Sequence, residues 1–403
     1  MPKIKVLYIH QDGLITGSAI SLRHFLSAIN RDSFEPVVLL AQEGPARQLY
    51  EELGIEVIVH AFKRFWTFPG PNWYSPTNFK QLKALLPDKQ LAAFIKKINP
   101  AIIHINDKAS INAGISMKGA GIPIVQHSRS SYCITAAKIN KWLSASAISR
   151  FADAVIAISE DETDGHEGVK NLHIINNTVP QSQIAEAIAQ KRDKRKELNI
   201  ADNDIVVGMV ADISAKKGAW DFMEMAAALV NKYPEKPLKF LMVGRVAESG
   251  QTPLNDGKSS PLSPKQYVEQ FIANNNLKGK ILVTGFRKDA LAIMSGLDVL
   301  VVANHNGVMG RQPIEAQALG ISTVVTQGHS GKSTILKNGF AGYVISNPVK
   351  QTELLTSIED LINHPEKRAE FGKHGQQYAA ERFNPIINMG KIEGIYKELL
   401  QAN

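Results

Sequence analysis

The chain has 403 residues, enough for two or three domains, and its 44% hydrophobic and 21% charged residues are ordinary for a soluble globular protein. No apolar run approaches the ~20 residues that span a bilayer, and the single cysteine, Cys133, excludes an internal disulfide and a zinc site of several thiolates. A strand pattern begins at once after the first residues, so we expect no secretory leader and a cytoplasmic location.

The formal net charge of +8 is unevenly distributed. Residues 61–150 contain 13 Lys and Arg against two acidic residues, so the remainder of the chain is slightly acidic. One interpretation is an anionic partner, either phosphates or the inner face of a membrane at which the protein is peripheral. The other is a solvated face with an accidental excess of positive charge. No nucleic-acid-binding motif accompanies the region, so we expect no nucleic-acid partner.

Short apolar runs alternate with amphipathic segments through the first half of the chain, and each run is nearly continuous rather than alternating. Parallel strands covered on both faces have this pattern, and its alternation with helices predicts a doubly wound α/β sheet. The predicted strands are 5–10, 35–41, 55–62, 101–106, 122–127, 153–159 and 173–177.

The pattern restarts after a Lys/Arg-rich helix at 183–198, which predicts a second Rossmann-like unit. Its strands are 205–211, 238–244, 280–285, 298–304, 322–327 and 342–346. Residues 247–265 are rich in Gly, Ser and Pro and predict a long surface loop. We expect an N-terminal domain of residues 1–180 with a C-terminal helix at 384–403, and a second domain of residues 181–383. Ligands of such sheets usually bind at the carboxyl ends of the strands, here in a cleft between the two domains.

The stretch TQGHSGKST at residues 326–334 has the glycine, lysine and hydroxyls of an ATP-binding phosphate loop. That loop requires a glycine five positions before Gly331, where Thr326 stands, and Gly328 is too near to wrap phosphates. A phosphate loop also normally follows the first strand of its domain. The sequence therefore argues against an ATPase.

The run NHNGVMGRQPIEAQALGISTVVTQGHSGKSTILKNGFAGYVI at residues 304–344 resembles the donor-binding region of the retaining glycosyltransferases of family 4, which have the GT-B fold. IVVGMVADISAKKGAWDF, VTGFRKDALAIMSGLDVLVV and RFNPIINMGKIEGIYKELL resemble other segments of that family in the same order. IHQDGLITGSAISL, AIIHIND and PIVQHSR resemble its first-domain loop and histidine-bearing strands. The likeness covers nearly the whole chain and is most specific at residues 205–380.

The resemblance implies two Rossmann-like domains facing across a cleft, with a C-terminal helix that crosses back to the first domain. It implies an acceptor-binding first domain, a donor-binding second domain, and retaining transfer of a sugar from a nucleotide-diphosphate donor, UDP- or GDP-linked. The expected acceptor is a glycan, a lipid-linked glycan or a small molecule, in bacterial polysaccharide or glycoconjugate biosynthesis. No cofactor or metal is expected, because neither a D-x-D motif nor a Cys/His cluster stands at a suitable place.

The resemblance also implies site residues. The catalytic set is His127, Lys217 and Arg129. The donor-binding set is Gly17, Asp212, Lys217, Gly244, Arg245, Phe286, Arg287, Gly307, Val308, Met309, Gly310, Arg311, Glu315, Lys332 and Ser333.

Several of these residues have a physical rationale of their own. Lys217 begins a helix, where an ammonium group and the helix N-terminus would both face a diphosphate, and Glu315 would accept the ribose hydroxyls. Gly17 would let the backbone approach a phosphate closely. The competing interpretations are an exposed lysine, a helix-dipole glutamate, a turn glycine and a core histidine at 127. We expect His104 to be a core histidine.

Two positions depart from the family pattern. Asp212 stands where the family has an arginine, and Gly307 stands where it has a glutamate. Losing a cation beside a diphosphate weakens transition-state stabilisation unless Arg311, Arg287, Lys332 or Arg245 compensates. We hypothesise that Lys332, Ser333 and Thr334 rebuild the missing donor contacts. The alternative is a nucleotide-sugar-binding or partner protein on the same fold with reduced or lost catalysis; an epimerase would need carboxylates that the sequence does not locate.

The aromatic and basic stretch FKRFWTFPGPNWY at residues 62–74 has two equal interpretations. It suits a lipid interface or a sugar-stacking acceptor site, and it equally suits a packed loop.

Overall fold

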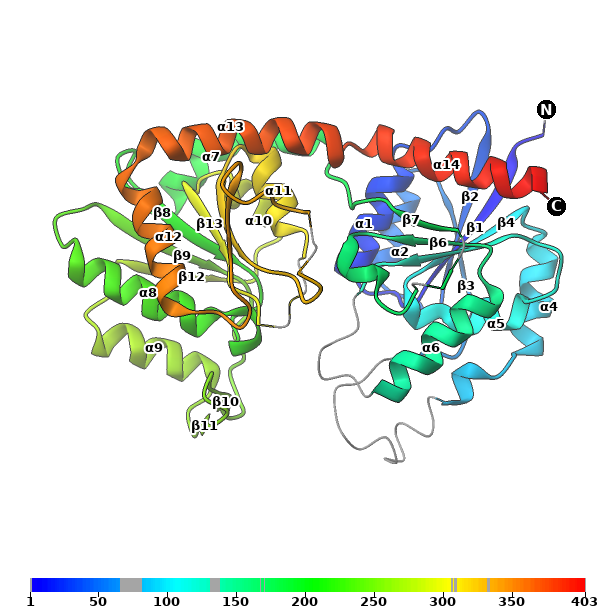
Figure 1. The fold of residues 1–403 in the computed structure, drawn as a ribbon, viewed down its shortest axis with the longest axis horizontal. Coiled ribbons are helices and arrows are strands. Elements are labelled where there is room, and N and C mark those ends of the chain that lie inside the picture. Colours follow the sequence, from blue (N-terminus) through cyan, green and yellow to red (C-terminus); the bar gives the residue numbers. More distant parts are fainter. Residues whose placement is uncertain are drawn as a thin grey trace. The chain divides into compact units, whose positions relative to one another are not determined.

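The structure is a computed structural model, drawn in Figure 1. It describes residues 2–65, 82–130, 138–166, 168–169, 171–305, 307, 310–331 and 334–402, with the backbone alone at 138–140. Two compact units divide the chain: the first comprises Met1–Thr178 and Asn384–Asn403, and the second comprises Val179–Phe383. The sequence placed this boundary after residue 180. Most of segment 62–74, from residue 66 onward, and Cys133 lie outside the described residues.

The first unit contains a seven-stranded parallel sheet in the order β3-β2-β1-β4-β5-β6-β7. Its strands are β1 (Ile4–His10), β2 (Phe34–Leu40), β3 (Glu56–Val59), β4 (Ile102–Asn106), β5 (Ile124–Ser128), β6 (Ala154–Ala157) and β7 (Leu172–Ile174). Side chains of β1 alternate between two cores: Val6 and Tyr8 pack on one face of the sheet, Leu7 and Ile9 on the other. Burial on both faces explains the continuous apolar runs of the sequence.

Helices cover both faces of this sheet (Figure 1). They are α1 (Gly17–Leu26), α2 (Ala46–Glu51), α4 (Lys89–Ile98), α5 (Ile111–Met117) and α6 (Lys138–Phe151), with short 3₁₀ turns η1 (Lys83–Leu85), η2 (Lys108–Ser110) and η3 (Glu160–Thr163).

The last helix, α14 (Pro385–Ala402), belongs to the first unit although it ends the chain. Met389, Ile392, Ile395 and Tyr396 are buried in the same core as Tyr8 and the apolar face of α1. The prediction that the C-terminal helix returns to the first domain is therefore confirmed.

The second unit contains a six-stranded parallel sheet in the order β12-β9-β8-β13-β14-β15. Its strands are β8 (Ile205–Val210), β9 (Leu238–Val243), β12 (Ile281–Gly285), β13 (Val299–Val302), β14 (Ser322–Thr326) and β15 (Gly342–Ile345). Its helices are α7 (Gln181–Glu197), α8 (Ala219–Lys232), α9 (Pro264–Asn274), α10 (Ala290–Met294), α11 (Gln312–Leu319), α12 (Gln351–Asn363) and α13 (Pro365–Arg382), with the turn η4 (Ala215–Lys217) before α8. The doubly wound α/β fold predicted for both halves is confirmed.

The predicted surface loop at 247–265 contains a short antiparallel hairpin, β10 (Thr252–Pro253) with β11 (Ser259–Ser260). The indole N–H of Trp220 donates to the Pro253 carbonyl at 2.8 Å, and the Thr252 hydroxyl donates to the Leu262 carbonyl at 2.8 Å. Thr252 is fully buried. These side-chain bonds order a segment whose composition alone indicates an irregular loop.

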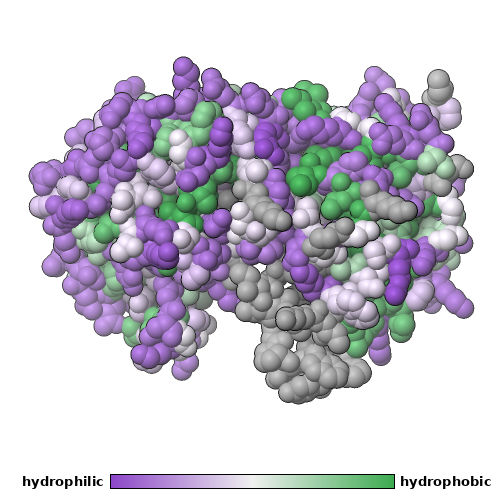
Figure 2. Space-filling view, viewed as in Figure 1, coloured by the Kyte–Doolittle hydropathy of each residue, from purple (hydrophilic) through white to green (hydrophobic). Residues whose placement is uncertain are grey.

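The face of the molecule in Figure 2 is mainly hydrophilic with small apolar patches. The exposed apolar side chains include Leu14 and Ile15 in the loop after β1, and Ile386 and Ile387 in the first turn of α14. In the described part of the chain, no helix has the length and apolar composition needed to cross a bilayer.

Gly218 connects η4 to α8 and provides a test of the second unit. Its φ is +73°, and a Cβ there would lie 1.9 Å from the Ala303 carbonyl oxygen. We expect Gly218→Ala to lower the free energy of unfolding by more than about 2 kcal/mol, because backbone strain and a steric clash add. Gly279, with a φ of +76° and no atom within 4 Å of its Cβ position, is the matched control, and Gly279→Ala should cost about 1 kcal/mol. Equal losses for the two variants in urea unfolding would contradict the clash.

Candidate functional site

Three polar side chains form a row at the carboxyl edge of the first sheet. His10 pairs with Asn106 across β1 and β4, and Asn106 pairs with His127 across β4 and β5. Residues opposite each other on neighbouring strands point to the same face of a sheet. All three are fully buried, on the face that α1 covers.

Arg129 connects this row from the segment that follows β5. Its Nε donates to Asn106 Oδ1, one Nη donates to Asn177 Oδ1 at 2.8 Å, and the other lies 3.3 Å from His127 Nδ1. The guanidinium also lies over the ring of Phe25, 5.1 Å from its centroid. Burial lowers the pKa of Arg129 to about 10, so the group remains charged at neutral pH.

A second chain of hydrogen bonds connects His127 to the core of the first unit through His104, Tyr396 and Tyr8. His104 Nε2 lies 3.1 Å from His127 Nδ1, and His104 Nδ1 lies 2.6 Å from the Tyr396 hydroxyl of α14. The Tyr396 hydroxyl also hydrogen-bonds with Tyr8. His104 is buried, as expected of a core histidine, yet it also orients the neighbouring ring.

Burial keeps the histidines of the row neutral. It lowers the pKa of His10 to about 3 and that of His127 well below its usual value, and the nearby charge of Arg129 lowers both further. The row therefore presents uncharged imidazoles at physiological pH.

The loop between β1 and α1 contributes Gly17, the first residue of α1. Thr16 caps this helix by accepting from the Ala19 N–H at 3.3 Å. Gly17 lies outside the left-handed region, and a Cβ added there would meet no described atom within 4 Å. The fold of the first unit thus places no demand for glycine at this position, unlike a tight turn.

The second unit brings its predicted residues to the carboxyl ends of β8, β9, β12 and β13. Lys217 is half-buried, and burial lowers its pKa while Asp212 opposes that shift. It lines a small cavity together with Asn304 and with Gln312, the first residue of α11. Lys217 and the first residue of α11 therefore border the same cavity, and a lysine beside a helix N-terminus suits an anion site.

Glu315 and Arg311 form an ion pair at the start of α11. Arg311 Nη2 lies 3.3 Å from Glu315 Oε1, and both groups are largely buried. Glu315 therefore combines a position in the first helical turn with a bound guanidinium. Gly310 precedes the pair, and a Cβ there would come within 2.2 Å of the Gln312 side chain.

Asp212, which replaces the family arginine, faces a cation. Arg245 Nε lies 3.4 Å from Asp212 Oδ1, with both side chains more than half exposed. The same guanidinium lies 5.6 Å from the ring centroid of Phe286, which is 62% exposed. Gly244 has a structural role, because a Cβ there would lie 1.7 Å from the Ala211 carbonyl oxygen.

Arg287 is directed elsewhere. Its guanidinium forms ion pairs with Glu197 at 2.6 Å and Asp289 at 2.7 Å. These pairs raise the pKa of Arg287 and hold its charge in a cluster with Lys194, which contacts Asp289 at 2.6 Å. Of the cations proposed to compensate for Asp212, Arg287 is thus bound to carboxylates.

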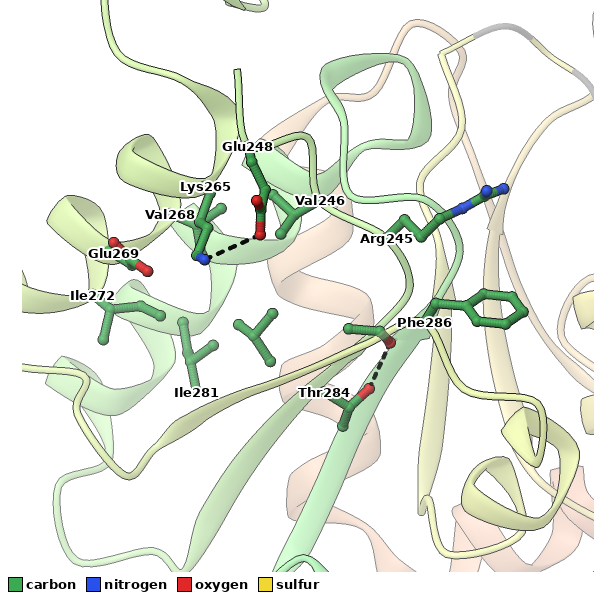
Figure 3. A pocket seen from close by; sticks show the side chains of 12 residues that line it. Arg245, Val246, Glu248, Lys265, Val268, Glu269, Ile272, Ile281, Thr284 and Phe286 are labelled. Atoms are coloured by element: carbon green, nitrogen blue, oxygen red, sulfur yellow. Dashed lines mark hydrogen bonds and ion pairs between the residues drawn. The ribbon is translucent and has the colours of Figure 1, made fainter. Parts of the chain in front are cut away.

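An apolar groove of about 640 Å³ begins beside Arg245 and Phe286 and runs between α9 and β12. Its walls are Val268, Ile272 and Ile281, and Figure 3 shows Arg245 and Phe286 at one end. Along another side of this groove Lys265 Nζ lies 3.2 Å from Glu248 Oε1.

Gly307 has a φ of +64°, and a Cβ there would lie 2.9 Å from the His329 backbone nitrogen. A glutamate would be strained in this conformation. Val308, Met309, Lys332 and Ser333 lie outside the described residues. The hypothesis that Lys332 and Ser333 rebuild the donor contacts stays a prediction.

Sequence reasoning missed one link of this site. The ring nitrogen Nε2 of His305 lies 2.7 Å from Asp221 Oδ2 of α8. The backbone N–H of His305 donates to the Lys216 carbonyl at 3.2 Å. Asn255 of the hairpin segment also donates to Asp221, at 3.0 Å. These bonds join the start of α8 to the loop after β13. Among the described residues, no group of three or more His, Cys, Asp or Glu side chains is arranged to hold a metal; the metal-free reaction remains a prediction.

Comparisons with known proteins cover both units. Two family models match, glycosyl transferases group 1 at residues 190–378 and glycosyltransferase family 4 at residues 15–183. A curated Escherichia coli protein named UDP-Gal:alpha-D-GlcNAc-diphosphoundecaprenol alpha-1,3-galactosyltransferase is 22% identical over 99% of this chain and 98% of its own. The capsular polysaccharide biosynthesis glycosyltransferase CapM of Staphylococcus aureus is 22% identical over 52% of this chain and 50% of its own.

Solved structures share the whole fold. Anabaena HepE in complex with UDP-glucose has a TM-score of 0.73 at 20% identity, covering 99% of this chain and 100% of its own. A glycosyltransferase from Rickettsia africae has a TM-score of 0.76 at 18% identity, with both chains fully covered. The two models together match nearly the entire chain, in the order of its two units. This chain therefore belongs to the group 1 glycosyltransferases of family 4 and has their two-domain GT-B fold.

Proposed function

We propose that this glycosyltransferase transfers a sugar with retention from a UDP-linked donor to a lipid-linked glycan acceptor in bacterial polysaccharide biosynthesis, without a metal. The second unit would bind the donor and the first unit the acceptor. Support for the donor comes from HepE, which has been solved with UDP-glucose, and support for the acceptor comes from the diphosphoundecaprenol substrate named for the E. coli relative. We expect the protein to act in the cytoplasm, peripherally at the inner membrane face.

The observation that carries the proposal is the position of Lys217 beside the N-terminus of α11. A nucleotide diphosphate leaves with growing negative charge, and an ammonium group with helix N–H dipoles would stabilise that charge. Arg245 and Arg311 would add positive charge at the same edge of the sheet. Glu315 would accept the ribose hydroxyls.

The alternative, a nucleotide-sugar-binding protein with little catalysis, draws on Asp212. Its exposed carboxylate would repel a diphosphate, but Arg245 lies 3.4 Å away and offsets the charge. The two candidates differ in donor hydrolysis. Incubation with UDP-sugars and no acceptor should release free sugar slowly from an enzyme, whereas a pure binder should bind UDP by calorimetry and release none.

Lys217→Ala tests the donor site. We expect kcat/KM for sugar transfer to fall about 100-fold or more, because transition-state charge loses its nearest ammonium group. Lys216→Ala is the matched control, since Lys216 is the exposed neighbour on the same turn, and it should retain most activity. The assay measures transfer from radiolabelled UDP-glucose and UDP-galactose to a GlcNAc-diphosphate carrying an undecyl chain. Equal losses in both variants would remove the specific role of Lys217.

Gly17→Ala separates a ligand-facing glycine from a structural one. Because a Cβ at this position meets no described atom, we expect unchanged or slightly higher stability and at least a tenfold loss of transfer. Gly390→Ala, at an equally open position in α14, should raise stability slightly and leave transfer unchanged. Full activity of Gly17→Ala would show that no ligand approaches this backbone closely.

A further inference from the structure

The amide of Asn106 has only one orientation compatible with its neighbours. Arg129 Nε can only donate, so the Asn106 atom that it contacts is the carbonyl oxygen. Asn106 Nδ2 therefore faces His10 Nδ1, at 2.9 Å. The orientation follows from an obligate donor rather than from choosing between similar atoms.

This orientation determines the tautomer of His10. Because Asn106 Nδ2 donates, His10 Nδ1 accepts, and the single proton of the neutral ring lies on Nε2. His127 Nδ1 faces both an Arg129 Nη at 3.3 Å and His104 Nε2 at 3.1 Å, so the His127 tautomer also depends on His104. The guanidinium, acting through Asn106, thus holds His10 as an Nε2–H donor.

Neither Nε2 has a hydrogen-bond partner among the residues that the structure describes. Both rings are fully buried, and leaving a buried polar atom without a hydrogen-bond partner is unfavourable. Such groups are rare in folded proteins and call for a partner beyond the described side chains. The family resemblance already places His127 in the catalytic set, whereas it implies no role for His10.

Asp12 indicates what His10 would bind. Asp12 Oδ1 lies 4.0 Å from His10 Nε2, too far for a direct hydrogen bond. An oxygen in hydrogen-bond contact with both atoms would subtend an angle of ~90°. A hydroxyl group suits this pair, since it accepts from the imidazole N–H and donates to the carboxylate. A phosphate cannot donate in this way and would be repelled by Asp12.

We propose that His10 and Asp12 form a hydroxyl-binding subsite for the acceptor sugar, with Arg129 acting through Asn106 as the positioning residue that keeps His10 an Nε2–H donor. This inference rests on the proposed function, because it assigns the subsite to the acceptor of that reaction. The pair is enclosed: His10 is fully buried and Asp12 is 4% exposed. A buried site of this kind accepts one hydroxyl and strongly rejects an analogue that lacks it.

Nuclear magnetic resonance of histidine-labelled protein tests the positioning role without any turnover. Long-range ¹H–¹⁵N spectra of the full chain should show His10 as the neutral Nε2–H tautomer, with its signals assigned by their loss in His10→Gln. In Arg129→Lys the amide of Asn106 is free to rotate, so we expect a mixture of tautomers at His10. An Nδ1–H ring in the wild type, or an unchanged tautomer in Arg129→Lys, would overturn the positioning role.

Kinetics with the GlcNAc-diphosphate-undecyl probe test the subsite. We expect His10→Phe to raise the acceptor KM at least tenfold while the Kd for UDP and the rate of donor hydrolysis stay within twofold of wild type. His10→Gln, which places an amide N–H near the Nε2 position, should restore part of the affinity. His374→Phe is the matched control, because His374 is half-buried and stacked on Phe340 in the other unit, and it should change none of these values.

Monodeoxy analogues of the probe identify the group that is bound. Wild type should reject one of them by at least 100-fold, and His10→Phe should accept that analogue and the parent equally. Loss of UDP binding in His10→Phe, or an unchanged preference among the analogues, would overturn the subsite. Absence of any transfer by wild type would instead contradict the proposed function, while the tautomer spectra would still decide the role of Arg129.

Discussion

The row of His10, Asn106 and His127 at the carboxyl edge of the first sheet depends on the contacts of the buried Arg129 guanidinium. It remains charged and can only donate hydrogen bonds. It contacts Asn106 at the end of β4, His127 in β5 and Asn177 after β7. Burying a guanidinium is unfavourable unless its N–H groups are hydrogen-bonded. The hydrogen bonds that satisfy Arg129 therefore also fix the positions of the side chains that accept them. Neutral histidines beside it follow from burial and from its charge.

The fold was predictable because its signal is local. Every one of the predicted strands of the two sheets is present, since nearly continuous apolar runs of five to eight residues report burial on both faces directly. The hairpin at β10 and β11 was not predictable, because hydrogen bonds from the Trp220 and Thr252 side chains order it. Amino-acid composition does not reveal such bonds. The return of α14 was expected from family resemblance rather than from periodicity.

The site was only partly predictable, for the opposite reason. His127 and Lys217 stand at strand and helix ends, which sequence patterns locate. The partners of His127 depend on cross-strand register and on long-range return of the chain: Tyr396 and His104 are 292 positions apart. Asn106 looked like the last residue of a strand, and its place between His10 and Arg129 becomes visible only when β1, β4 and β5 are set in register. His305 and Asp221 are joined in the same way, across 84 positions.

The two units present different chemistry at the carboxyl ends of their strands. In the second unit the cations are partly or well exposed, and Arg245 offsets the carboxylate of Asp212 while Lys217 lies at a helix start. In the first unit Arg129 is enclosed, and it fixes the orientation of the Asn106 amide that faces His10. Exposed cations attract phosphates over several ångströms, whereas neutral donors paired with a carboxylate discriminate between hydroxyl groups at contact. A transferase with a diphosphate-bearing donor and a hydroxyl-bearing acceptor, as proposed for this chain, would need both, and the difference in burial between Arg129 and Arg245 would provide them separately.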